Sequence, residues 1–288
     1  MTHELVDVVI SGLSSGSTYA MMALGMALVY GISRVFNFAY GSFYSLGGYL
    51  AWLFLGNQLG YPIAFACVIP GLFFIGIATE RFTLRPLRKR RNWEMLAMMS
   101  TLGLALFMDN LYLATFGPFA KSLPVLFKGT VNAAGFVISM QDIATTIIAI
   151  SIIIGLWFFL SKSREGLAMR AVAQDMIGSE IVGIAKDRVF SYTFGIATVL
   201  VGIGGILLSP KYFVSPLGGW EILVKAWVIT AFGGMGSLEG AVYAAFILGM
   251  VEAFVAWQLG LTWTLFIWFI ILIVMFIVRP QGLRGSWG

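Results

Sequence analysis

The longest run of this sequence without a charged side chain extends from Val35 to Thr79, 45 consecutive residues. A helix needs about 20 mostly apolar residues to cross the hydrocarbon core of a bilayer, so this run is long enough for two crossings. The cluster Gly56–Pro62 (GNQLGYP) supplies turn-forming residues that would divide it. Inside a bilayer each backbone group must find its partner within the segment, which favours helices. The chain is therefore expected to fold as a helical membrane protein.

The composition of the whole chain agrees with this expectation. Hydrophobic residues make up 59% of the sequence and charged residues 11%, whereas soluble domains have about 25% charged residues. No hydrophilic segment is long enough for an ordinary soluble domain, so residues 1–288 are expected to form a single transmembrane domain. The sequence has one cysteine, Cys67, and one histidine, His3. These predict no disulfide framework, no metal site and no catalytic residues.

The apolar segments predict an all-α, polytopic transmembrane helical bundle. An external loop at 117–142, with room for a small hairpin, separates the fourth and fifth spans. We expect about nine spans, of which 222–238 is short and interrupted by Lys225 and glycines. The expected spans are 8–33, two within 35–79, 95–116, 143–160, 189–209, 222–238, 240–258 and 261–278.

The basic residues predict the orientation of these spans. Arg34, the run 81–91, the segment 161–188 and the C-terminal tail together hold 14 of the 18 Lys and Arg residues. Basic loops stay on the cytoplasmic side, which places the N-terminus outside and the C-terminus in the cytoplasm. That arrangement requires an odd number of crossings and favours nine. Eight crossings are the alternative, if 222–238 only re-enters the membrane.

Two polar, glycine-containing clusters predict broken helices, at Asn37–Ser42 (NFAYGS) and Phe232–Gly240 (FGGMGSLEG). The N–H groups and positive dipole at a helix start can meet a substrate carboxylate. The alternative is that both clusters are turns at the cytoplasmic surface. The candidate residues of a translocation path in these clusters are Asn37, Tyr40, Gly41, Ser42, Gly233, Gly234 and Ser237.

Asp109 is the acidic residue deep inside the otherwise uncharged span 95–116. A charge at that depth costs about 2.5–3.5 kcal/mol on insertion scales, so its side chain should face the bundle interior. Lys225 and Glu252 are candidate partners. A residue of the translocation path and an interhelical hydrogen bond that fixes the bundle are equally good interpretations.

The segment Ser161–Arg188, here called the docking module, is a charged island with five basic and four acidic residues. Its first part, from Arg164 to Asp175, contains strong helix formers. Gly178 and Gly183 then allow the chain to turn back to the membrane. The side chains expected to share one helical face are Leu167, Ala168, Ala171 and Val172. Such a helix suits a groove on a partner protein; the alternative is a helix lying on anionic lipid.

Four motifs together resemble one family. The runs REGLAMRAVAQD, NFAYGS, AFGGMGSLEGA and GLSSGSTYAMMALG are similar to those of branched-chain amino acid ABC importer permeases, LivH-type membrane subunits, over essentially the whole chain. Tyr40 departs from the smaller or more polar residue of many relatives. The resemblance implies that the docking module couples to an ATPase through Glu165, Gly166, Leu167, Arg170, Ala171, Asp175 and Gly183.

The resemblance also implies partners and a substrate class. The partners would be a second homologous permease subunit, two cytoplasmic ATPase subunits and an external solute-binding protein, in a bacterial inner membrane. The substrates would be branched-chain or other apolar amino acids, with urea, short amides and aromatic or other carboxylates as alternatives. A phosphate-binding loop of the form GxxxxGK[ST] is missing from the sequence, so this chain is expected to be no enzyme and to bind no cofactor, while its partners bind ATP and Mg²⁺. An ATP-independent carrier or channel and a non-transporting scaffold are the competing classes.

Overall fold

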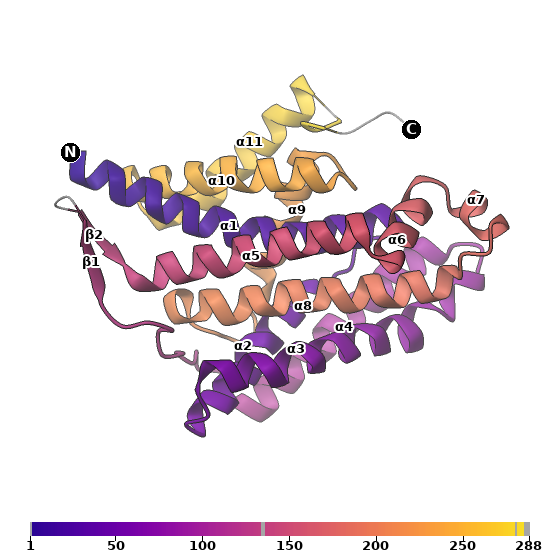
Figure 1. Ribbon diagram of the computed structural model, residues 1–288, viewed down its shortest axis with the longest axis horizontal. Coiled ribbons are helices and arrows are strands. Elements are labelled where there is room, and N and C mark those ends of the chain that lie inside the picture. Colours follow the sequence, from indigo (N-terminus) through magenta and orange to yellow (C-terminus); the bar gives the residue numbers. More distant parts are fainter. Residues whose placement is uncertain (1, 134–135, 280, 285–288) are drawn as a thin grey trace. The chain divides into compact units, whose positions relative to one another are not determined.

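The computed structural model describes residues 2–133, 136–279 and 281–284. These residues are mostly helical, with one small hairpin (Figure 1). The α-helices are α1 (Thr2–Ser33), α2 (Tyr40–Gly56), α3 (Gly60–Thr79), α4 (Trp93–Phe116), α5 (Met140–Lys162), α6 (Arg164–Gln174), α7 (Met176–Ile181), α8 (Lys186–Tyr212), α9 (Gly219–Gly233), α10 (Leu238–Gln258) and α11 (Thr264–Val278). Short helical turns are η1 (Glu80–Leu84), η2 (Leu87–Lys89) and η3 (Leu261–Trp263).

In the described part of the chain, six helical segments are long and apolar enough to cross a membrane. They are Gly60–Lys89, Trp93–Phe116, Met140–Lys162, Lys186–Tyr212, Leu238–Gln258 and Leu261–Val278. The prediction of an all-α, multi-pass membrane protein is confirmed. Helix α9 has 15 residues, about 22 Å at 1.5 Å per residue, which is less than the ~30 Å hydrocarbon core. The count of nine crossings therefore stays a prediction.

The chain divides into two compact units. The first contains Met1–Ala27, Pro124–Ile153 and Val224–Gly288, and the second contains Leu28–Leu123 and Ile154–Leu223. Helices α1, α5 and α9 each begin in one unit and continue without a break into the other.

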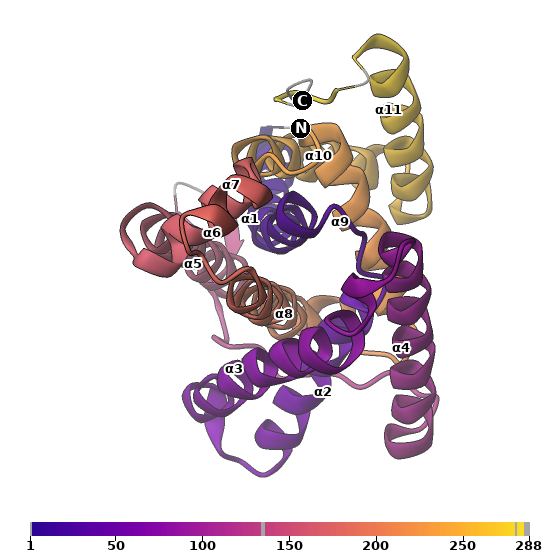
Figure 2. The same ribbon diagram turned by 90° about the vertical axis from the view of Figure 1, so that its right-hand side faces the viewer.

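In the second unit, α8 lies against α2 and α3 (Figure 2). Most of α8 is buried, including Gly202 and Gly205. A Cβ atom added at Gly47 of α2 would lie 2.6 Å from the Cα atom of Gly202. Lipid provides no hydrophobic drive between helices, so small residues that permit such close approach are what hold these helices together.

This close contact predicts the effect of one added methyl group. The Gly47→Ala variant should lose about 1–3 kcal/mol of stability, because the methyl meets the backbone of Gly202 rather than a flexible side chain. The matched Gly103→Ala change in α4 has open space around its Cβ position, so it should be neutral or slightly stabilising. Thermal unfolding of the purified proteins in detergent compares them, and equal midpoints for the two variants would contradict the packing argument.

In the first unit, α1 and α10 also approach through glycines. A Cβ atom at Gly249 would lie 2.6 Å from the Cα atom of Gly16. The strands β1 (Thr130–Ala133) and β2 (Phe136–Ser139) pair in antiparallel fashion, with Thr130 opposite Ser139. This pairing confirms the small hairpin expected in the loop 117–142.

Candidate functional site

The docking module begins with a helix that folds back on α5. The Ser163 hydroxyl caps α6 by accepting a hydrogen bond from the Gly166 amide at 2.9 Å. A Cβ atom at Gly166 would lie 2.6 Å from the Cα atom of Leu160, so the crossing needs glycine. The helix expected from Arg164 is confirmed as α6. Gly166 therefore sets how α6 leaves the end of α5.

Asp175 and Gly183 turn the chain between α6 and α8. The Asp175 carboxylate caps α7 by accepting hydrogen bonds from the amides of Ile177 and Gly178, each at 3.0 Å. Gly183 has φ of +86°, a backbone conformation that glycine adopts without strain. These two residues turn the chain so that α8 can begin at Lys186.

Ion pairs link the two ends of the module. Arg188 at the start of α8 pairs with Glu165 at 2.8 Å, and Lys186 pairs with Glu180 at 2.8 Å. Both pairs are substantially exposed, and such pairs contribute only about 0–1 kcal/mol each. Glu165 thus helps to orient the module without adding much stability.

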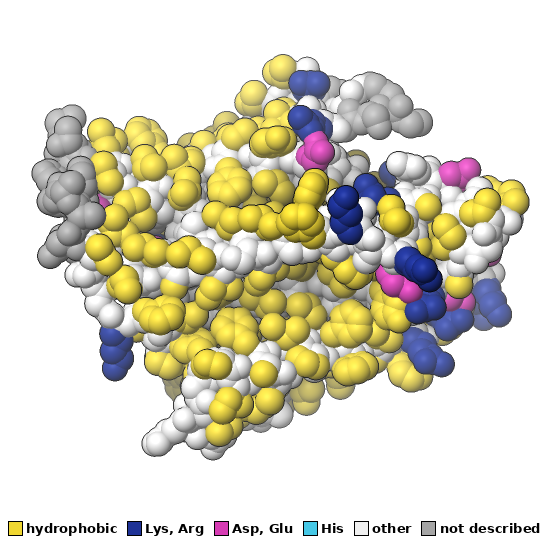
Figure 3. Space-filling view, in the orientation of Figure 1, with side chains coloured by type: hydrophobic (Ala, Val, Ile, Leu, Met, Phe, Trp, Pro, Cys, Tyr) yellow, Lys and Arg dark blue, Asp and Glu magenta, His cyan; other side chains and the backbone are white. Residues whose placement is uncertain are grey.

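Large apolar side chains are exposed on the module. The exposed fractions are 48% for Leu167, 74% for Ile177, 81% for Ile181 and 75% for Val182. Lys and Arg side chains gather over the same region, with hydrophobic side chains among them (Figure 3). We call Leu167, Ile177, Ile181 and Val182 the apolar docking surface. Exposed apolar groups of this kind are typical of a protein–protein or a membrane contact.

The structure corrects one part of the expected docking face. Val172 is 2% exposed and packs inward together with Met169 at 1%, because these residues and the buried Gly166 recur every three positions on one side of α6. Ala168 and Ala171 are half-buried, while Leu167 and Arg170 are exposed. The sequence reasoning missed Ile177, Ile181 and Val182. These three residues are large and apolar, yet they lie in a segment predicted to be outside the membrane, and this contrast could have predicted an exposed contact surface.

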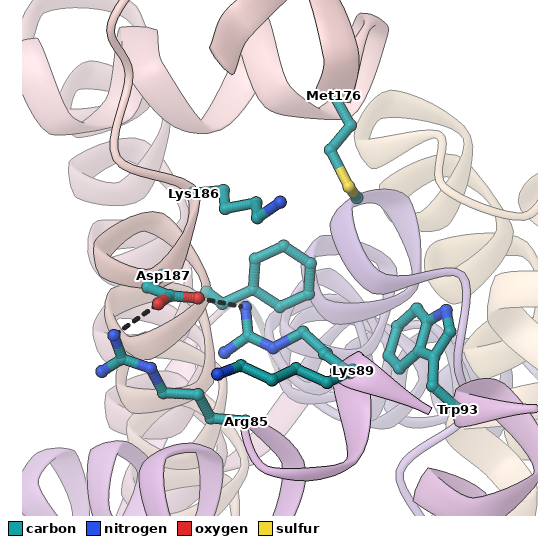
Figure 4. Close-up of a pocket in the computed structure, with 8 residues that line it drawn as sticks. Arg85, Lys89, Trp93, Met176, Lys186 and Asp187 are labelled. Atoms are coloured by element: carbon teal, nitrogen blue, oxygen red, sulfur yellow. Dashed lines mark hydrogen bonds and ion pairs between the residues drawn. The ribbon is translucent and has the colours of Figure 1, made fainter. Parts of the chain in front are cut away.

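The docking module and the basic run 81–91 together line a basic pocket of about 350 Å³ in the second unit (Figure 4). The guanidinium groups of Arg85 and Arg88 both pair with Asp187, and the Arg88 Nη1–Asp187 Oδ1 distance is 3.1 Å. Arg88 also pairs with the buried Glu80, which accepts a hydrogen bond from Ser191 as well. The sequence showed the basic run but not the acidic partners. The residues that line the pocket are Arg85, Arg88, Lys89, Trp93, Met176, Lys186, Asp187 and Phe190.

Asp109 lies in a buried network within the second unit. Its carboxylate accepts hydrogen bonds from the Ser42 hydroxyl and the Trp220 indole, each at 2.8 Å, and Asp109 is 3% exposed. The Tyr112 hydroxyl donates to the Ser42 carbonyl at 3.0 Å. The expected partners were Lys225 and Glu252, and the structure instead gives Asp109 two neutral donors from α2 and α9.

The other residues of the Asn37–Ser42 cluster are buried as well, except the half-buried Phe38. Asn37 is 2% exposed and Tyr40 1%, so they do not form a surface turn. The Asn37 side-chain oxygen accepts a hydrogen bond from the Ala39 amide at 3.0 Å, which fixes the non-helical backbone before α2. A Cβ atom at Gly41 would lie 2.7 Å from the Gly219 carbonyl carbon. Gly41 thus lets α2 meet the start of α9.

The second cluster forms a tight turn in the first unit. Gly233 ends α9 and Gly234 has φ of +105°. The Ser237 hydroxyl caps α10 by accepting a hydrogen bond from the Gly240 amide at 3.1 Å. The C-terminal tail closes on this turn, because the Arg284 amide donates to the Gly233 carbonyl at 3.0 Å. Both clusters therefore join a helix end to a helix start.

A buried ion pair in the first unit joins residues that the sequence left unconnected. Lys225 of α9 pairs with Glu252 of α10 at 2.9 Å, and their side chains are 5% and 7% exposed. The Tyr19 hydroxyl lies 3.1 Å from the Lys225 ammonium and donates to Glu252 at 3.2 Å. The Lys225 ammonium lies 5.7 Å from the Trp268 ring centroid. Two rings and a carboxylate therefore replace water around this cation.

Among the described residues, no group of three or more His, Cys, Asp or Glu side chains is placed to hold a metal ion. The chemistry of these sites is hydrogen bonding, charge pairing and packing.

The sequence model of the family described as "Branched-chain amino acid transport system / permease component" matches residues 8–276. This chain belongs to that permease family. It is 31% identical over 298 residues to the high-affinity branched-chain amino acid transport system permease protein BraD of Pseudomonas aeruginosa, covering 98% of this chain and 96% of BraD. It is 30% identical to the corresponding LivH of Escherichia coli, covering 96% and 94%. No solved structure matches the chain.

More distant permeases differ in the cargo that their names give. The autoinducer 2 import system permease protein LsrC of an Enterobacter strain is 25% identical, covering 88% of this chain and 73% of LsrC. The resemblance drawn from the motifs is confirmed at the level of the family. As a permease of this family the chain is a multi-pass membrane subunit of an ABC transport system and is not itself catalytic.

Proposed function

We propose that this chain is the transmembrane permease subunit of an ATP-driven ABC importer for branched-chain or other apolar amino acids. An external solute-binding protein would deliver the substrate, and two cytoplasmic ATPase subunits would bind ATP and Mg²⁺ and hydrolyse the nucleotide. A second, homologous permease subunit would complete the pathway as a heterodimer. The names of BraD and LivH, which align along nearly their full lengths, support the substrate class.

The observation that carries this proposal is the apolar docking surface, which lies on a charged module held in shape by ion pairs and helix caps. Leu167, Arg170 and Ala171 would contact the ATPase on α6, and Ile177, Ile181 and Val182 would extend that contact. Glu165, Gly166, Asp175 and Gly183 would hold the module in shape through the ion pair, the helix crossing, the α7 cap and the left-handed turn. A short, rigid element that fits a partner's groove can transmit a movement without unfolding.

We place the chain in a bacterial inner membrane as one permease domain over 1–288, with an external N-terminus and a cytoplasmic C-terminus. The three helices that run from one unit into the other support a single domain. Nine crossings would put all the basic loops on the cytoplasmic side, and the short α9 would be the broken span.

The candidate translocation path consists of the two helix junctions and Asp109. Asn37, Tyr40, Gly41 and Ser42 precede or begin α2, and Gly233, Gly234 and Ser237 join α9 to α10. Non-helical backbone at membrane depth is stable where protein or a water-filled path surrounds it. The non-helical backbone at Asn37 is buried within the protein, as this interpretation requires.

Two alternatives stay open for the test. The same importer could carry urea, short amides or aromatic and other carboxylates, and the LsrC relative supports diversity of cargo. An ATP-independent carrier or channel would need no docking module.

Reconstitution in proteoliposomes tests the proposal. With the ATPases, the second permease and the binding protein present, uptake of labelled leucine, isoleucine or valine should require ATP inside the vesicles. Uptake that persists without the ATPases, driven by an ion gradient, would refute the importer. ATP-dependent uptake of urea or a carboxylate but not of apolar amino acids would refute only the substrate class.

A further inference from the structure

The basic pocket beside the docking module carries more positive charge than its acidic residue can neutralise. Four basic side chains line it, from Arg85, Arg88, Lys89 and Lys186, against one carboxylate from Asp187. The two arginines are already committed to Asp187 and to the buried Glu80 behind it. Including Glu80 and Glu180, which pairs with Lys186, the site retains a net charge of +1, from four basic and three acidic residues. The unpaired positive charge belongs to Lys89 and favours the binding of an anion.

Two hydrogen-bond donors of the pocket have no acceptor among the described residues. Among the described residues the Lys89 ammonium has no hydrogen-bond or ion-pair partner, and the Arg88 Nε atom is buried without a hydrogen bond. The Arg88 guanidinium is held 4.2 Å above the Phe190 ring, so it is fixed in place rather than mobile. Buried donors normally have partners, and an anion would supply one here.

The surroundings of the pocket indicate which kind of anion fits. The pocket lies at the end of the candidate span Gly60–Lys89, whose last turns carry most of the basic run. Phe74 and Phe82 on this span are 67% and 78% exposed, and Phe82 is three residues before Arg85. An apolar surface that leads to a basic pocket suits a molecule with acyl chains and a charged head. Trp93, with its amphipathic indole, lines the pocket and is of a type enriched at the membrane interface.

We propose that this pocket binds the phosphate headgroup of an anionic membrane phospholipid. Its volume of about 350 Å³ is in the range of small-ligand sites, and basic pockets at the cytoplasmic ends of transmembrane helices hold such headgroups by charge. Lys89, Lys186 and Arg88 surround the phosphate, Trp93 flanks it, and the acyl chains lie along the exposed side chains of α3 and η1.

The lipid also contacts α7 of the docking module, because Met176 of α7 lines the pocket and Lys186 is paired with Glu180 of α7. A bound headgroup would draw α7 toward the basic run and hold the apolar docking surface in place. The expected consequence is that anionic lipid stabilises the module. This inference does not depend on which substrate the permease carries.

The experiment measures lipid binding to the delipidated full-length chain in neutral detergent by native mass spectrometry. Phosphatidylglycerol should bind and survive dilution, and phosphatidylcholine should bind much more weakly. The Lys89→Gln variant should bind phosphatidylglycerol about fivefold more weakly, and Lys89→Glu weaker still, because each basic residue near an anionic lipid contributes about that factor. The matched control is Arg91→Gln, which removes an exposed charge two residues away that does not line the pocket.

Unchanged thermal midpoints would show that the Lys89 variants fold, since Lys89 is exposed. Equal binding of the two lipids, or equal losses in Lys89→Gln and Arg91→Gln, would overturn the proposal. Displacement of the lipid by millimolar inorganic phosphate would identify a site for a free anion instead and would also overturn it. If the lipid is lost when purified ATPase subunits are added, the pocket belongs to the interface with the ATPase. This result would also overturn the proposal.

Discussion

The Leu167→Glu variant is expected to lose ATP-driven uptake while its membrane part stays folded. Leu167 is 48% exposed on α6, so the substitution disturbs little internal packing of the permease. At the centre of a contact with the ATPase it would place an unpaired charge against an apolar groove. Loss of such an anchor costs 2 kcal/mol or more, which is at least about a 30-fold loss of affinity. Uptake into proteoliposomes should fall correspondingly when the ATPase is limiting.

Two measurements separate docking from folding in this experiment. Co-purification of the ATPase with the permease should be lost in Leu167→Glu and kept in the control Leu167→Met, which preserves the apolar side chain. The thermal midpoint of the permease alone should be the same for both variants. If Leu167→Glu retains ATPase association and transport, the docking assignment is wrong. A variant at Val172 would be uninformative, because this side chain is 2% exposed and its change would disturb packing.

The second large effect is expected in the first unit, at the buried pair of Lys225 and Glu252. Glu252→Gln keeps the size of the side chain and an oxygen that can accept the Tyr19 hydrogen bond, but it leaves the Lys225 ammonium without its carboxylate. Breaking a buried pair from one side costs about 3–5 kcal/mol, because the remaining charge is uncompensated. The thermal midpoint in detergent should drop more than for any conservative change at an exposed position.

The double variant Lys225→Met, Glu252→Gln tests whether the charge itself is responsible. With both charges removed, much of the stability should return, since replacing a buried pair by uncharged side chains of similar size is often neutral. If the double variant is as unstable as Glu252→Gln alone, the loss of stability comes from the changed shape of the side chains and not from the unpaired charge. If the double variant is stable but inactive in vesicles, the pair has a part in transport as well as in folding.

Local pattern predicted the helices because helix formation in a membrane depends on nearby residues. The expected spans 95–116, 189–209 and 240–258 correspond to Trp93–Phe116, Lys186–Tyr212 and Leu238–Gln258. In lipid every backbone donor is satisfied within its own segment, so an uncharged run of sufficient length is enough to specify the element. The small hairpin and the helix of the docking module followed from turn residues and helix propensity in the same way.

Pairings between distant residues did not follow from the sequence. Asp109 was recognised as costly to bury, but its donors Ser42 and Trp220 lie 67 and 111 positions away, and nothing local selects them over Lys225 or Glu252. The same holds for α6, where the periodicity put Val172 with Leu167, whereas Val172 is buried and Leu167 is exposed in the folded chain.

The sequence by itself determined that this chain is an all-α membrane protein of a permease family with a charged segment between two apolar runs, because length, apolar content and local motifs decide those properties. Only the tertiary structure decided which side of that segment is exposed, which carboxylate neutralises which cation, and that the basic run forms a pocket. Those outcomes depend on which helices meet, and the free energy of burying a charge or an apolar side chain is settled only by the groups that surround it.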